Sequence, residues 1–83
     1  MNITIADIEA KIEAEIPDAE ATVTQPRGPH DEDHLAATVV SPAFEGETLV
    51  AQHQRVYDAL DEYMTTEIHA LELKTYTPEE YNE

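Results

Sequence analysis

The sequence predicts an α/β domain of the α+β type, with elements in the order α-β-β-α-β-α. Isoleucines recur at helical spacing near the N-terminus, two short strand-like runs flank a polar loop, and a second amphipathic helix precedes another strand-like run. Because a helix between two strands normally makes a right-handed crossover to a parallel strand, the third strand should lie parallel to the second. We therefore expect a three-stranded mixed sheet packed against helices.

The first helix is expected over residues 4–16. Thr4 is a good N-cap residue, and Asp7 three positions later completes an approximate capping box. Pro17 should end the helix, because proline cannot continue it. The predicted apolar stripe consists of Ile5, Ile8, Ile12 and Ile16. The acidic side chains that should point elsewhere are Glu9, Glu13 and Glu15.

Residues 19–25 and 34–41 are expected to form the two strands of a hairpin. The polar segment between them, residues 27–33, contains a Gly-Pro pair that is typical of a turn. This loop is longer than a tight hairpin turn, so the strand pairing should depend on the hydrophobic pattern more than on the turn.

The second long helix is expected over residues 47–63, after a connector at residues 42–47. Its predicted apolar stripe consists of Leu49, Val50, His53, Val56, Tyr57 and Leu60. A third strand should lie within residues 65–76. Thr77 then opens a second capping box, with Pro78 at the first helical position, which should start a terminal helical turn.

Length and composition predict one small domain spanning residues 1–83. The chain has 83 residues, no cysteine and no apolar run long enough to cross a bilayer, so we expect no disulfide and no membrane span. Its N-terminus lacks the basic region and the apolar block of a signal peptide. We therefore expect a soluble, cytoplasmic protein.

Acidity dominates the composition. The chain has 19 Asp and Glu residues against 4 Lys and Arg residues, for a formal net charge of −15. This balance suggests a halophilic proteome, because concentrated salt screens the self-repulsion of such a chain. Nucleic-acid binding requires clustered basic residues. The basic residues here are scattered at Lys11, Arg27, Arg55 and Lys74, so we do not expect nucleic acid as a partner.

We also expect no enzyme. Ser41 is the only serine, and no base is paired with it in the sequence. The acidic run at residues 31–33 lacks the spacing and the central glycine of a calcium-binding loop.

Several motifs follow one another in the rest of the chain. Phe-Glu-Gly occupies residues 44–46, His-x-x-Val-Tyr residues 53–57, Ile-His-Ala-Leu residues 68–71 and Thr-Pro-Glu residues 77–79. In this order and at these spacings, over roughly residues 34–80, the chain resembles the BolA family.

This resemblance implies a BolA-like, class II KH-like fold and a protein partner. BolA proteins pair with monothiol glutaredoxins and share a bridging [2Fe–2S] cluster, in iron–sulfur cluster trafficking or iron sensing. The resemblance implies that the chain alone is a monomer without a cluster. With its partner it would form a heterodimer. Some members are instead described as DNA-binding regulators, so a nucleic-acid-binding regulator is the alternative function. A metal-free protein adaptor is a third hypothesis.

The resemblance identifies His69 as a cluster ligand. Neutral imidazole nitrogen binds iron well, and histidine in place of cysteine raises the potential of a two-iron cluster. Period-two counting puts His69 on the same face of the third strand as Leu71 and Leu73. The alternative is a half-buried strand histidine that is hydrogen-bonded to the backbone.

The family supplies the second ligand, cysteine or histidine, from the loop between the first two strands. The expected position falls at or beside Asp31. His30 is therefore our first choice and His34 the second, because the hard oxygen of Asp31 suits an iron–sulfur cluster poorly. The alternative is a solvated acidic loop, with His69 acting alone.

We interpret His53 as structural, buried or capping the connector, and not as a ligand. The family's basic residues around this histidine are reduced here to Arg55, which also weakens the DNA hypothesis.

Overall fold

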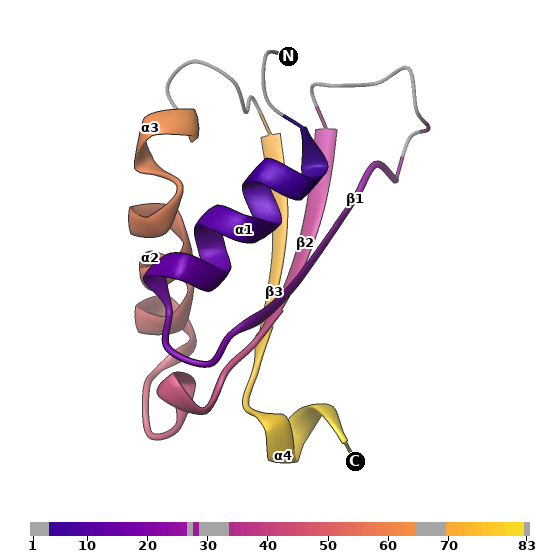
Figure 1. Ribbon diagram of the computed structural model, residues 1–83. Helices are drawn as coiled ribbons and strands as arrows, with labels where there is room; N and C mark the ends of the chain where they lie inside the picture. Colours follow the sequence, from indigo (N-terminus) through magenta and orange to yellow (C-terminus); the bar gives the residue numbers. More distant parts are fainter. Residues whose placement is uncertain (1–3, 27, 29–33, 65–69, 83) are drawn as a thin grey trace.

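The computed structural model describes residues 4–26, 28, 34–64 and 70–82, and its elements follow the predicted order (Figure 1). The elements are α1 (Ile5–Glu15), β1 (Glu20–Thr24), β2 (His34–Val40), the 3-10 turn η1 (Pro42–Phe44), α2 (Leu49–Ala59), α3 (Asp61–Met64), β3 (Ala70–Tyr76) and α4 (Pro78–Tyr81). In this part of the chain, no helix combines the length and the hydropathy needed to cross a membrane.

The predicted mixed sheet is confirmed, with strand order β1-β2-β3. β1 runs antiparallel to β2 in a register that pairs Thr22 with Thr38. β3 runs parallel to β2 over its whole length, from the pair His34–Ala70 to the pair Val40–Tyr76. The chain between these two parallel strands contains η1, α2 and α3, which form the crossover connection that parallel strands require.

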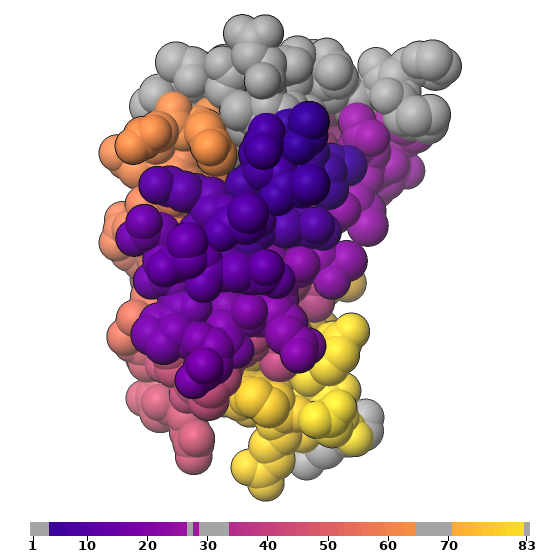
Figure 2. Space-filling model, viewed as in Figure 1, coloured from indigo at the N-terminus to yellow at the C-terminus, as the bar shows by residue number. Residues whose placement is uncertain are grey.

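The helices α1 and α2 pack on one face of the sheet, as predicted. Figure 2 shows α1, in indigo, lying across the middle of the molecule on this side. A single buried cluster joins both helices to the sheet, and its members are Ile8, Ile12, Ile16, Val23, Leu35, Ala37, Val39, Phe44, Val56 and Leu60. The other face carries the alternate strand residues, among them Ala36, Thr38, Glu72 and Lys74, and we call it the open face.

The two predicted capping boxes are present. Thr4 Oγ1 accepts a hydrogen bond from the Asp7 amide at 3.0 Å, and the Asp7 carboxylate accepts one from the Thr4 amide at 3.0 Å. Thr77 and Glu80 make the same reciprocal pair at the start of α4. Each box satisfies backbone N–H groups that the first turn of a helix leaves unpaired.

Two glutamates of α1 do more than face solvent. The Glu13 carboxylate accepts a hydrogen bond from the Ala21 amide at 3.1 Å, and the Glu9 carboxylate accepts one from the Val23 amide at 2.8 Å. Both amides belong to β1, an outer strand whose other neighbour is β2. The expectation that these side chains simply point away from the core was therefore incomplete, because they cover the outer edge of the sheet.

The second helix is shorter than predicted and is interrupted. α2 begins after the N-cap Thr48, and Leu60, which is fully buried, separates it from α3. The predicted stripe is wrong at its start, where Leu49 is 60% and Val50 is 80% exposed. The residues of α2 that face inward are Gln52, Val56 and Ala59, at the helical spacing i, i+4, i+7. A polar residue thus occupies the first inward position of the helix.

Gln52 connects three elements through a buried polar bridge. Its Oε1 accepts a hydrogen bond from the Thr75 hydroxyl of β3 at 2.7 Å. Its Nε2 donates to the Glu47 carbonyl at 2.9 Å and to the Phe44 carbonyl at 3.4 Å. Gly46, between these two carbonyls, has a φ of +79°, which explains the glycine of the Phe-Glu-Gly motif. The bridge holds the connector and α2 against β3.

We predict that Gln52→Leu lowers the free energy of unfolding by about 1–3 kcal/mol, because the buried Thr75 hydroxyl and the Glu47 carbonyl lose their bonds to the Gln52 side chain. Urea unfolding measures this change. Thr75→Val removes the same bond from the other side, so the two substitutions together should cost less than their sum. The matched control is Gln54→Leu on the exposed side of α2, with an expected change within about 0.5 kcal/mol. Additive effects of Gln52→Leu and Thr75→Val would contradict the bridge.

We also predict that the folded state depends on salt, because a net charge of −15 is carried by a domain of 83 residues. Molar potassium chloride should raise the melting temperature by at least about 5 °C over dilute buffer, which corresponds to roughly 1 kcal/mol for a domain of this size. Melting curves followed by circular dichroism would measure it. Equal midpoints in the two buffers would refute the prediction.

Candidate functional site

The candidate site lies where β2 and β3 begin. Because these strands are parallel, their first residues are neighbours, and His34 of β2 is paired with Ala70 of β3. In the sequence, His69 comes directly before Ala70. Of the three predicted cluster ligands, His34 is described by the structure, whereas His30 and His69 lie outside the described residues.

His34 is half-buried and belongs to the open face. The next residue, Leu35, is 1% exposed and belongs to the core, and the alternation continues along β2 to Val39. Leu71 and Leu73 of β3 also pack against the core. His34 therefore lies on the sheet face opposite these two leucines.

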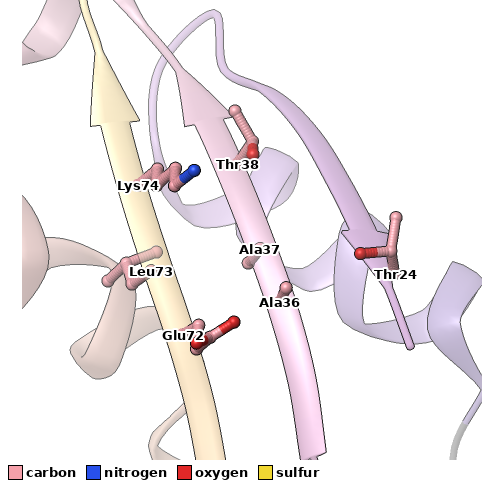
Figure 3. Close-up of a pocket in the computed structure, with 7 residues that line it drawn as sticks. All are labelled: Thr24, Ala36, Ala37, Thr38, Glu72, Leu73 and Lys74. Carbon is pink, nitrogen blue, oxygen red and sulfur yellow. The ribbon is translucent and has the colours of Figure 1, made fainter. Parts of the chain in front are cut away.

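A shallow groove of about 570 Å³ lies on the open face, next to His34 along the strands. Figure 3 shows the small side chains of β2 at its floor and the charged side chains of β3 leaning over them. The lining residues are Thr24, Ala36, Ala37, Thr38, Glu72, Leu73 and Lys74. Among the described residues, no group of three or more His, Cys, Asp or Glu side chains could hold a metal ion.

His53 is partly buried on α2. Its Nε2 is buried and has no hydrogen-bond partner among the described residues. Of the two structural roles considered for His53, burial or capping of the connector, the second is filled by its neighbour Gln52, which donates to the carbonyls of Phe44 and Glu47. The reason is helical geometry, because residue 52 and not residue 53 lies on the inward line with Val56 and Ala59.

Two of the described basic side chains are paired with acids. Lys11 lies 3.6 Å from Glu15, and the Arg55 Nε lies 2.6 Å from the Glu47 carboxylate. The hydrogen bond to Glu47, together with its charge, raises the pKa of Arg55, which therefore stays protonated. Each of these two cations therefore has a glutamate of its own beside it, which offsets its charge toward a phosphate.

Ser41 has a structural role. It is fully buried, its hydroxyl donates to the Pro17 carbonyl at 2.6 Å, and it accepts a hydrogen bond from the Ala43 amide at 3.0 Å. These bonds tie the turn after α1 to the start of η1. No signal in the sequence beyond its position before Pro42 pointed to this role.

Comparisons with known proteins agree with the fold. The family model for BolA-like proteins matches residues 6–80. A protein of Haemophilus influenzae named "DNA-binding transcriptional regulator BolA" is 42% identical over 50 residues, which cover 60% of this chain and 48% of that protein. The chain thus spans about half the length of this curated relative.

Two solved structures cover nearly the whole chain. A BolA homologue from Coxiella burnetii is 39% identical with a TM-score of 0.83, over 98% of this chain and 99% of the other. The BolA domain of SufE1 from Arabidopsis thaliana is 33% identical with a TM-score of 0.78, over 96% of this chain and 98% of the other.

Proposed function

The chain belongs to the BolA family, and we propose that it is a binding module that pairs with a monothiol glutaredoxin and co-ligates a bridging [2Fe–2S] cluster. In this proposal the module acts in iron–sulfur cluster trafficking or iron sensing. His69 is one ligand, and His30, with His34 as the alternative, is the other. The glutaredoxin contributes a cysteine thiolate and a small thiol that it binds.

The main support for this proposal is the parallel register of β2 and β3. It brings the start of β2, which follows the loop containing His30, beside Ala70, the residue that follows His69 in the sequence. Residues 36 positions apart in the sequence, 34 and 70, thereby become neighbours. A ligand pair drawn from the loop and from the third strand needs this proximity.

The donor chemistry also supports a shared cluster. The chain offers imidazole nitrogens and no thiolate, since it has four histidines and no cysteine. Imidazole suits iron, and a bridging cluster draws its remaining ligands from the partner, so it does not require a closed four-ligand site in this chain. When bound, the cluster would supply one-electron redox chemistry or iron and sulfide for transfer.

Strand alternation favours His30 over His34 as the second ligand. His34 lies on the open face, whereas the residues expected to share a face with His69, Leu71 and Leu73, pack against the core. The side chains of His34 and His69 would then start from opposite faces of the sheet, so a cluster bound by both would have to lie beyond the ends of the strands. A loop residue such as His30 is not bound to one face in this way.

A DNA-binding regulator is the second candidate, because the Haemophilus influenzae relative carries that name. Charge opposes it here. The net charge is −15, and Lys11 and Arg55 are each paired with a glutamate. The long-range attraction that normally supplies most non-specific affinity for DNA would be replaced by repulsion.

We predict that a mixture of this protein with a monothiol glutaredoxin, iron, sulfide and a small thiol, assembled anaerobically at high salt, gives a visible circular dichroism spectrum different from that of the glutaredoxin alone. His69→Ala should abolish the difference, because it removes the nitrogen that binds iron. His30→Ala should alter it more than His34→Ala. The matched control is His53→Gln, which removes an imidazole on α2 and should leave the spectrum unchanged.

Size-exclusion chromatography of the same mixtures separates two kinds of failure. A heterodimer with an unaltered glutaredoxin spectrum would support the metal-free adaptor in place of the cluster module. Absence of both the heterodimer and the altered spectrum would overturn the proposal. An altered spectrum that persists in His69→Ala would remove His69 from the ligand set.

We further predict no retention of duplex DNA in a filter-binding assay, at low or at moderate salt, because no basic cluster offsets the acidic charge. Binding at low salt that weakens steeply as salt increases would contradict this and revive the regulator hypothesis.

A further inference from the structure

The two outer strands of the sheet differ in how their free edges are covered. On β1, the amides of Ala21 and Val23 donate to the carboxylates of Glu13 and Glu9. β3 is the other outer strand. Apart from its pairing with β2, none of the described residues provides a hydrogen-bond partner for the backbone of residues 71–75. Unpaired edges of this length are templates for another strand.

The direction of the free backbone groups follows from one hydrogen bond. The Tyr76 carbonyl accepts from the Ser41 amide at 3.0 Å, on the side of β2. Because N–H and C=O groups alternate sides along a strand, the groups of Leu71, Leu73 and Thr75 point away from β2. Three successive donor–acceptor positions are therefore available at the free edge.

The charges of β3 specify a partner. Glu72 and Lys74 flank Leu73 and are both exposed on the open face. An antiparallel pairing of β3 with another β3, centred on Leu73, places Glu72 of each protomer opposite the partner's Lys74. The same register makes Leu73 a hydrogen-bonded pair with its own copy and joins Leu71 to the partner's Thr75. The strand is thus complementary to itself under a twofold rotation.

We propose that a second copy of this chain docks on the free edge of β3, in the antiparallel register centred on Leu73, and extends the two sheets into one of six strands. Opposite charges directly across an antiparallel pair are stabilising, and like charges are destabilising. Neither Glu72 nor Lys74 makes a hydrogen bond or an ion pair with another described residue, so both are available. This proposal does not depend on the proposed function.

Salt should govern the association, because two copies that each carry −15 repel one another. We expect sedimentation velocity at molar potassium chloride to show a concentration-dependent dimer that dissociates in dilute buffer. Lys74→Glu should weaken the dimer by roughly tenfold or more, because it replaces two opposite-charge pairs with two like-charge pairs. The matched control is Lys11→Glu, which makes the same change of net charge on α1 and should have a much smaller effect.

A charge exchange tests the register itself. The double variant Glu72→Lys, Lys74→Glu keeps the net charge and should restore the dimer. An equimolar mixture of the single variants Glu72→Lys and Lys74→Glu should form a mixed dimer, although each alone is weakened. A monomer at every concentration and salt would overturn the proposal. So would a dimer that Lys74→Glu and Lys11→Glu weaken equally, or single variants that do not pair with each other.

Discussion

The parallel pairing of β2 with β3 is the constraint on which the rest of this structure depends. It joins residues 34–40 to residues 70–76. The two strands can pair only if the chain between them, which contains η1, α2 and α3, forms a closed loop. Such non-local pairing has a cost in chain entropy that local contacts do not have. The buried Gln52 bridge offsets part of this cost, because it binds the beginning of the crossover to Thr75 at the far end of β3.

The elements themselves could be predicted because their signals are local. Capping boxes at Thr4 and Thr77, an isoleucine repeat and β-branched runs each lie within a few residues of sequence. The inward face of α2 could not be predicted in this way. Leu49 and Val50 are the more apolar residues, yet Gln52 faces inward, because it finds three partners that are distant in sequence or belong to the backbone. Apolarity is a weak guide where a polar side chain can be fully satisfied.

The acidic residues show the same limit. On a chain with a net charge of −15, a glutamate predicts little beyond a solvated surface. Glu9 and Glu13 instead accept hydrogen bonds from alternate amides of β1 and so close one edge of the sheet. This arrangement requires that α1 run alongside β1, which only the folded chain establishes.

The candidate site is also predicted only in part from the sequence. The family motifs indicate His69 and the loop histidines, but the sheet face on which His34 lies is known only from the burial of its neighbours in the folded chain.

Both proposals involve β3, because the proposed ligand His69 comes directly before it in the sequence and the proposed self-pairing uses its free edge. The proposed ligand end lies at Ala70 and the centre of the self-pairing lies at Leu73, three residues further along, or about 10 Å at the rise of a β-strand. A stable protein interface covers about 800 Å² on each side. The width of such a patch is considerably greater than this separation. A glutaredoxin at the start of β3 and a second copy at its free edge would therefore compete for overlapping surface. The self-paired dimer and the complex with the partner would then exclude one another. The apparent affinity for the partner would therefore fall as the concentration of the chain rises, because more of the chain would be in the dimer.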